Sequence, residues 1–151
     1  MNNFSENITI RNVNVSDAAT LKEINDAITN EDADIDFAQI IKEYKQKDEE
    51  DTSFVAEIDG QVVAYMISYT LYGGFGLKKS AWIVTFGVDP KYMGQGIGKM
   101  LAHKLFEKYR EKGIKHIYTT VMWDSIDLLS FFKTLGFDRS SFINLKKVIK
   151  D

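Results

Sequence analysis

The chain has 151 residues, of which 44% are hydrophobic and 27% are charged, and this is the composition of a globular protein. It contains no cysteine and two histidines, so disulfides, cysteine nucleophiles and thiolate metal sites are excluded and no metal is expected. The formal net charge of −3 is distributed unevenly, because residues 1–75 sum to −10 and residues 76–151 sum to +7.

This separation of charge is compatible with two ligands of opposite sign. A cationic substrate would suit the acidic part and a phosphate-bearing ligand the basic part, although uneven surface solvation explains the same numbers equally well. Basic and aromatic residues nowhere alternate densely, so nucleic acid is not an expected partner. No apolar run approaches the ~20 residues that span a bilayer, and the amino end lacks a signal-peptide pattern. We expect a cytoplasmic protein with one domain, residues 1–151, and no membrane partner.

The first part of the chain predicts a strand followed by two helices. Residues 8–13 alternate between apolar and polar side chains, which is typical of a strand. Asp36 is placed to cap the second helix. Helical spacing is shown by Leu21, Ile24 and Ile28 in the first helix and by Phe37, Ile40, Ile41 and Tyr44 in the second. Between these helices lie four acidic residues that either belong to a solvated loop or attract a cationic amine. They are Glu31, Asp32, Asp34 and Asp36.

The remainder predicts three strands, two helices and a closing segment. Asp59-Gly60 favours a tight turn between strands at residues 54–58 and 61–72. A nearly continuous apolar strand at residues 81–88 is followed by a helix at 96–112, a strand at 116–122 and a helix at 126–135. Residues 137–149 are expected to hold one or two closing strands. The predicted order is β-α-α-β-β-β-α-β-α-β, an α/β fold with a mixed sheet.

A glycine-rich turn joins the long apolar strand to the helix that follows it. Gly94, Gly96 and Gly98 allow a tight turn that exposes several N–H groups at the helix N-terminus, where unpaired donors and the helix dipole bind anions. Lys99 adds a cation. The spacing fits neither a P-loop nor the Gly-x-Gly-x-x-Gly fingerprint. The turn therefore predicts a pyrophosphate cradle, and a strand–helix turn that binds nothing is the alternative.

Residues 88–98 resemble the coenzyme A motif of the GCN5-related N-acetyltransferase (GNAT) superfamily. They read Val-Asp-Pro-Lys-Tyr-Met-Gly-Gln-Gly-Ile-Gly, and the family pattern is Arg/Gln-x-x-Gly-x-Gly/Ala after a central strand. Residues 123–137 are similar to a later family motif, a helix headed by Asn that ends in Tyr-x-x-x-Gly-Phe. The resemblance covers about residues 8–149, the expected core of a single N-acetyltransferase domain.

The resemblance implies a V-shaped cofactor cleft between the fourth and fifth strands, with acetyl coenzyme A (acetyl-CoA) as co-substrate. A bulge at Phe86-Gly87-Val88 would leave backbone groups for the thioester and pantetheine, and the Val88 N–H would stabilise the developing oxyanion. The residues that the resemblance implies in cofactor binding are Phe86, Gly87, Val88, Met93, Gly94, Gln95, Gly96, Ile97, Gly98, Lys99, Ser125 and Phe132.

The sequence departs from the family at positions that carry side-chain chemistry. Met93 occupies the Arg/Gln position, and Ser125 occupies that of the Asn that heads the later helix. The family's Tyr, often the acid for the leaving thiolate, corresponds to Phe132, and the Glu that commonly assists as base in N-terminal acetyltransferases corresponds to Thr120. Asp124 is our candidate catalytic base, and capping of the following helix is its alternative role.

Two functions of different class follow from these observations. The first is an N-acetyltransferase that moves acetyl from acetyl-CoA to a primary amine by direct attack in a ternary complex, since the chain has no cysteine and no serine in a nucleophile-elbow pattern. The second is an acyl-CoA binding or sensing domain with little turnover, which Phe132 and Thr120 favour. The acceptor would be a small-molecule or peptide amine, and a homodimer stays open.

Overall fold

Five strands and four α-helices are found in the residues that the structure, a computed structural model, describes: 7–30, 32, 34–47, 52–72 and 79–151. With two short 3-10 helices, the order is β1 (Ile8–Asn12), η2 (Val15–Asp17), α1 (Ala18–Thr29), α2 (Phe37–Lys47), β2 (Phe54–Ile58), β3 (Gln61–Leu71), β4 (Ser80–Val88), η3 (Pro90–Tyr92), α3 (Ile97–Glu111), β5 (Ile117–Thr119) and α4 (Ile126–Thr134). The chain divides into two compact units, Met1–Thr120 and Val121–Asp151. None of the helices in the described ranges is long and apolar enough to cross a membrane.

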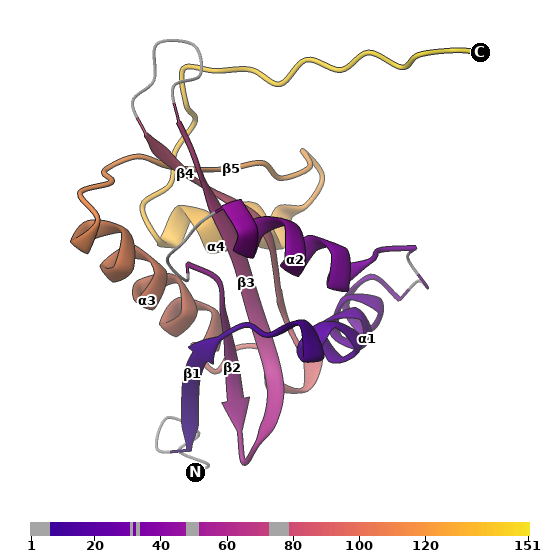
Figure 1. Cartoon of the computed structure of the whole chain (residues 1–151), viewed down its shortest axis with the longest axis vertical. Helices are drawn as coiled ribbons and strands as arrows, with labels where there is room; N and C mark the ends of the chain where they lie inside the picture. The colour runs from indigo at the N-terminus through magenta and orange to yellow at the C-terminus, as the bar shows by residue number, and fades with distance from the viewer. Residues whose placement is uncertain (1–6, 31, 33, 48–51, 73–78) are drawn as a thin grey trace. The chain divides into compact units, whose positions relative to one another are not determined.

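The strands of the first unit form one mixed sheet in the order β1-β2-β3-β4-β5 (Figure 1). The first three pairings are antiparallel, whereas β4 and β5 are parallel and are connected through α3. Asp59 and Gly60 form the expected turn between β2 and β3. The predicted α/β fold with a mixed sheet is therefore confirmed.

The helices of the first unit cover opposite faces of this sheet. Side chains alternate along a strand, so Tyr65 and Ile67 of β3 point to one face and Ser68 points to the other. Tyr65 and Ile67 pack with residues of α1 and α2. The Ser68 hydroxyl instead lies 2.6 Å from the Tyr109 hydroxyl of α3. α1 and α2 therefore lie over one face of β3, and α3 lies over the other.

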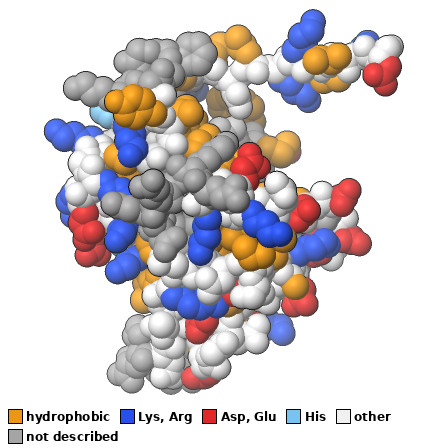
Figure 2. Space-filling model, viewed as in Figure 1, with side chains coloured by type: hydrophobic (Ala, Val, Ile, Leu, Met, Phe, Trp, Pro, Cys, Tyr) orange, Lys and Arg blue, Asp and Glu red, His pale blue; other side chains and the backbone are white. Residues whose placement is uncertain are grey.

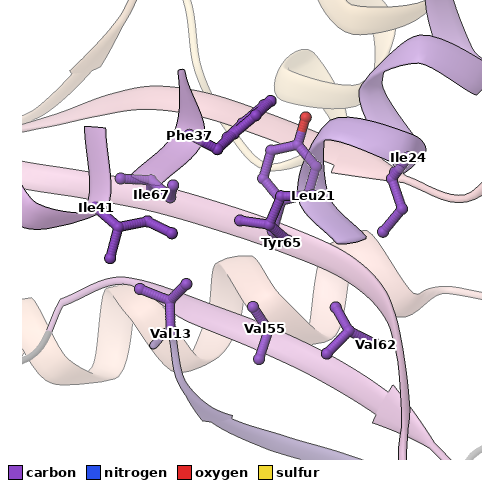
Figure 3. Close-up of a cluster of buried hydrophobic side chains, with 9 residues drawn as sticks. All are labelled: Val13, Leu21, Ile24, Phe37, Ile41, Val55, Val62, Tyr65 and Ile67. Atoms are coloured by element: carbon purple, nitrogen blue, oxygen red, sulfur yellow. The ribbon is translucent and has the colours of Figure 1, made fainter. Parts of the chain in front are cut away.

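A buried apolar cluster fills the space between the sheet, α1 and α2 (Figure 3). Its members are Val13, Leu21, Ile24, Phe37, Ile41, Val55, Val62, Tyr65 and Ile67. The ring of Phe37 meets that of Tyr65 edge-on, with 5.5 Å between the ring centroids. Asp36 accepts a hydrogen bond from the Gln39 N–H at 3.0 Å, so α2 begins with the cap that the sequence predicts. The Tyr65 hydroxyl is the one side-chain oxygen in this cluster.

Buried hydroxyl groups connect α3 to the opposite face of the sheet. The Ser68 N–H donates to the Ser53 hydroxyl at 2.9 Å, and that hydroxyl donates to the Ser68 carbonyl oxygen at 3.1 Å. The Ser68 hydroxyl donates to the Thr52 carbonyl oxygen and also contacts the Tyr109 hydroxyl. The Ser53 hydroxyl thus provides hydrogen-bond partners for the backbone groups of Ser68 at the point where the pairing between β2 and β3 ends.

The second unit consists of α4 and an extended segment. Phe132 of α4 is buried and meets Phe131 and Phe137 edge-on, with ring centroids 5.2 and 5.1 Å away. The closing strands predicted within residues 137–149 are wrong, because the structure describes these residues without any strand. Local bonds replace a ladder at the start of this segment, where the Ser140 hydroxyl accepts from the Phe142 N–H at 3.1 Å. Apolar alternation predicts a strand only where backbone groups also find a partner.

Candidate functional site

The predicted cofactor residues of the first unit begin where β4 continues beyond its pairing with β5. The parallel ladder has three residue pairs, and the last of them joins Ile83 to Thr119. The Thr119 hydroxyl donates to the Ile83 carbonyl oxygen at 3.1 Å, at the end of this ladder. β4 then continues to Val88, and its residues from Thr85 to Val88 pair, among the described strands, only with β3.

β4 contains a bulge, and it lies nearer to the start of the strand than predicted. The pairing advances from Ile83 to Thr85 while β3 advances by one residue, so Val84 is the extra residue. The bulge expected at residues 86–88 is wrong, since these residues pair in register with β3. The bulge therefore coincides with the end of the β5 ladder and precedes the predicted thioester residues.

Gly87 is explained by close packing against a tyrosine. A Cβ atom at this position would lie 2.8 Å from both Cε1 and the hydroxyl oxygen of Tyr65. Tyr65 is fully buried, and its hydroxyl shares a hydrogen bond with the Thr85 side chain. Burial raises the pKa of the Tyr65 phenol above its ordinary value, while the hydrogen bond from Thr85 acts in the opposite direction. The phenol therefore stays protonated at neutral pH.

The register of β4 gives the direction of the Val88 backbone groups. The Asp89 N–H donates to the Val63 carbonyl oxygen at 2.8 Å, so Asp89 faces β3. Backbone groups alternate in direction along an antiparallel pair, so Gly87 also faces β3 and Val88 faces away from it. The Val88 N–H consequently points to the side of β4 on which the β5 ladder has already ended.

The glycine turn presents a group of backbone donors at the start of α3. Gly94 and Gly96 have φ values of +80° and +81°, and a Cβ atom at either position would meet nothing within 4 Å. The first helical bond runs from the Met100 N–H to the Gly96 carbonyl oxygen at 3.1 Å. Between described residues, no hydrogen bond is donated by the N–H groups from Gly94 to Lys99. The turn therefore offers consecutive N–H donors and open space, which is the geometry that holds a diphosphate.

Within residues 93–99, Lys99 is the one cationic side chain. Met93, at the family's Arg/Gln position, is 49% exposed, and Gln95 is exposed as well. Ile97 and Gly98 are buried at the start of α3 and anchor the turn, whereas Lys99 is exposed. Anion binding here depends mainly on backbone N–H groups, so the change to Met93 leaves the main donors in place.

Three predicted site residues, Asp124, Ser125 and Phe132, belong to the second unit. Ser125 is the N-cap residue of α4, and its carbonyl oxygen accepts from the Leu129 N–H at 3.0 Å. Its side chain makes no capping hydrogen bond. The Asp124 carbonyl oxygen accepts from the Ile126 N–H at 3.0 Å, so Asp124 also helps to form the entry into this helix. Phe132 is a buried packing residue and carries no proton to donate.

Sequence reasoning missed Tyr65 and Thr85. Both lie in segments that are apolar throughout, and the sequence distinguishes neither from a core residue. Gly87 was the available signal, because glycine within a strand often marks the close approach of another group. The partner in that approach, Tyr65, lies on the neighbouring strand and is found only from the register.

Known proteins match this chain in sequence. The profile of the acetyltransferase (GNAT) family matches residues 18–137. An N-alpha-acetyltransferase of Sulfurisphaera tokodaii is 29% identical over 136 residues, which are 85% of this chain and 78% of that protein. An uncharacterized N-acetyltransferase of Methanocaldococcus jannaschii is 28% identical over 98 residues, which are 64% of this chain. The match spans 43% of the length of that second relative.

The fold is also similar to that of solved acetyltransferases. The aminoglycoside N-acetyltransferase AAC(6')-Iy, solved in complex with CoA, aligns with a TM-score of 0.74 and 16% sequence identity. The alignment covers 93% of this chain and 94% of that chain. At this identity, the similarity establishes the shared fold.

Proposed function

Since this chain belongs to the GNAT acetyltransferase family, we propose that it is an N-acetyltransferase that moves acetyl from acetyl-CoA to a primary amine. One observation carries the proposal: a row of backbone donors at residues 94–99 follows β4, whose final N–H points away from β3, on the side where the pairing with β5 has ended. The row is suited to a diphosphate, and the strand end is suited to a thioester carbonyl.

Each part of acetyl-CoA has proposed ligands in the first unit. The N–H groups from Gly94 to Lys99 would bind the diphosphate, and the Lys99 ammonium would add a cation beside it. Backbone groups of Phe86 and Val88, which face away from β3, would hold the pantetheine and thioester, with the Val88 N–H donating to the carbonyl oxygen and Gly87 lying between them. Ser125 and Phe132 remain proposed contacts from the second unit. A single oxyanion donor is typically worth about 10²–10³ in kcat.

Acetyl-CoA supplies a thioester that a free amine attacks directly. The amine nitrogen forms a bond to the carbonyl carbon, the carbon–sulfur bond breaks, the sulfur leaves as a thiolate, and the nitrogen releases one proton to water as the amide forms. A thiol with a pKa near ~8.5 needs no dedicated acid, so the loss of a proton donor at Phe132 is tolerable. The incoming ammonium, with a pKa near ~10.4, must lose a proton first. Asp124 is the proposed base, and water is the alternative proton acceptor.

The acceptor is proposed to be a small-molecule or peptide amine. The Sulfurisphaera tokodaii relative is named an N-alpha-acetyltransferase, and AAC(6')-Iy is named an aminoglycoside N-acetyltransferase. Both names describe transfer to amines. Their acceptors differ in size, so a panel of polyamines, aminoglycosides and peptides with free N-termini is the appropriate screen.

A second candidate function is supported by the buried position of Phe132. This residue occupies the place of the family's usual acid and packs in an aromatic cluster, and Thr120 occupies that of a usual base. General acid or base catalysis is typically worth about 10²–10⁴-fold in rate. A protein without both would bind acyl-CoA and turn it over slowly, as a sensing domain does.

Two measurements on the full chain distinguish these functions. Calorimetric titration with acetyl-CoA tests binding, and release of the free CoA thiol with the amine panel tests transfer. Binding with acceptor-dependent thiol release supports the transferase, and binding without release on any amine supports the sensor. Absence of binding would refute both.

A proline substitution tests the proposed oxyanion donor. Val88→Pro removes an N–H that is not part of the β3 ladder, so the sheet retains its hydrogen bonds. We expect kcat to fall by about 10²–10³ while acetyl-CoA binding persists. Val88→Ala retains the N–H and is the matched control. Equal kcat values for the two variants, both folded, would remove Val88 from the mechanism.

A further inference from the structure

The second unit carries most of the large apolar side chains that this chain leaves exposed. Fifteen such side chains are exposed in the described ranges, and nine of them belong to residues 121–151, the smaller of the two units. Four of the nine lie in the extended segment of residues 143–149, and each is at least 64% exposed: Ile143, Leu145, Val148 and Ile149. Figure 2 shows orange and blue side chains together along this segment, at the upper right of the view. Such a concentration of exposed apolar side chains marks an interaction surface.

The apolar residues of this segment gather on one side of the chain. Side chains alternate in direction along an extended backbone, so Ile143, Leu145 and Ile149 project to the same side. Each of these three side chains is 84% or 85% exposed. The other side is mostly polar and includes Asn144 and Lys146. This is the pattern of a strand with one buried face, although the structure describes residues 143–149 without a strand.

β5 is the last strand of the sheet, and its outer edge can receive another strand. Among the described strands, β5 pairs only with β4. The Ala81 N–H of β4 donates to the His116 carbonyl oxygen at 3.0 Å, so this carbonyl faces β4. Backbone groups alternate in direction along a strand, so those of Ile117 and Thr119 face away from β4. A row of outward N–H and C=O groups at a sheet edge is a template for a further strand.

A second copy of the chain supplies a partner for both features. The high exposure of residues 143–149 is that of a single chain, so covering them takes a second molecule. Each copy has one apolar segment to give and one strand edge to receive it, so two copies satisfy each other through exchange about a two-fold axis. Each partner then buries both its own segment and its own edge, which brings the interface toward the ~800 Å² per partner of a stable dimer.

We propose that this protein forms a homodimer by exchanging its C-terminal segment, so that residues 143–149 of one copy add as a strand to the β5 edge of the other. The outward backbone groups of Ile117 and Thr119 form the new ladder, and Ile143, Leu145 and Ile149 are buried against the partner. Apolar burial supplies most of the affinity, and the backbone hydrogen bonds align the added strand. The dimer is independent of the proposed activity, because no residue of 143–149 is a proposed ligand of acetyl-CoA.

The first test measures the mass of the full chain by analytical ultracentrifugation over a range of concentrations. We expect a species with twice the 17.3 kDa mass of one chain. Leu145→Asp places a charge on the apolar side and should raise the dimer Kd by at least about 10-fold. Leu145 is 84% exposed in the single chain, so this variant should fold normally. Asn144→Asp is the matched control, because it adds the same charge on the polar side, and its dimer Kd should stay within about 3-fold of the wild-type value.

Hydrogen exchange of the wild-type chain locates the interface without any substitution. The dimer should protect the amides of Ile117 and Thr119 and amides within residues 143–149, and this protection should be lost on dilution or, for a dimer too tight to dilute, in Leu145→Asp.

Three results would overturn the proposal. One is a monomer at every concentration, whether or not residues 143–149 are protected in it. Another is a dimer that leaves Ile117, Thr119 or residues 143–149 unprotected. The third is an equal dimer Kd for Leu145→Asp and Asn144→Asp. None of these measurements uses acetyl-CoA, so a failure of the proposed acetyltransferase function is a separate result.

Discussion

Adding one methyl group at Gly87 tests the close packing beside the proposed site. A Cβ atom there would lie 2.8 Å from Tyr65 Cε1, 2.8 Å from the Tyr65 hydroxyl oxygen and 2.9 Å from Tyr65 Cζ. Ordinary carbon contacts lie at about 3.5–4.0 Å, so the ring must move by much of an ångström. The ring is fully buried and is packed edge-on against Phe37, so it cannot turn away into solvent.

Overpacking of this kind costs about 1–3 kcal/mol, and we expect Gly87→Ala to lower stability by that amount. For a chain of this length, each kcal/mol corresponds to about 2–4 °C in Tm. Urea denaturation followed by circular dichroism gives the free energy of unfolding. Gly60→Ala is the control, because φ there is +78° and a Cβ atom would meet nothing within 4 Å, so only backbone strain is added.

A double-mutant cycle separates the clash from backbone strain. Tyr65→Leu removes the ring, so Gly87→Ala in that background should cost at least about 1 kcal/mol less than in the wild-type chain. Gly60→Ala and Tyr65→Leu should be additive within about 0.5 kcal/mol. Additivity between positions 87 and 65 would refute the reasoning, because it would show that the Tyr65 ring does not impose glycine at position 87.

Asp17→Asn should destabilise the protein by about 1.5–3 kcal/mol at pH 7 and by less at pH 3, as measured by urea midpoints. Burial alone would raise the pKa of the Asp17 carboxyl, but hydrogen bonds from the Arg11 guanidinium and a backbone N–H outweigh it and lower the pKa. The stabilisation by Asp17 is therefore present above the unfolded pKa of about 3.9 and is lost as pH falls through the lower folded pKa. A destabilisation by Asp17→Asn that stays constant from pH 7 to pH 3 would contradict this. Tyr109→Phe removes one buried hydroxyl partner of Ser68 and should lower the free energy of unfolding by about 1 kcal/mol, with a normal m-value; an unchanged urea midpoint would count against that hydrogen bond. Lys99→Ala should raise the Kd for acetyl-CoA by up to about 5-fold at low salt and by less at high salt. Lys104→Ala, further along α3, is the control and should leave this Kd unchanged. Identical calorimetric titrations for the two variants would show that Lys99 does not contribute to binding of the diphosphate.

Much of the fold was predictable because its signals are local. Apolar spacing indicates α1 and α2, and Asp59-Gly60 indicates the hairpin, since each depends on residues close in sequence. The bulge at Val84 and the missing closing strand depend on pairing between distant segments. Neither feature changes the local pattern of apolar residues. The sequence therefore predicted the bulge at the wrong residues of β4 and predicted closing strands that do not form.

The candidate site divides in the same way. The glycine turn was visible in the sequence because glycine alone adopts its backbone conformation readily, and the structure gives Gly94 and Gly96 positive φ values as that reasoning requires. Thr85 and Tyr65 were invisible because a tyrosine and a threonine in apolar strands look like ordinary core residues. Their relation to Gly87 needs the register of two strands, which one sequence does not provide.

A cofactor site made from main-chain donors is insensitive to most substitutions around it. Met93 stands where the family has a polar residue, yet the donors from Gly94 to Lys99 remain, because their direction depends on backbone conformation. Proton transfer depends on side chains and is changed directly by substitution. Phe132 and Thr120 stand at the positions where the family commonly has a side-chain acid and base. Substitutions that alter the backbone of the turn should therefore abolish acetyl-CoA binding, whereas those at side-chain positions should change the choice of acceptor and the rate.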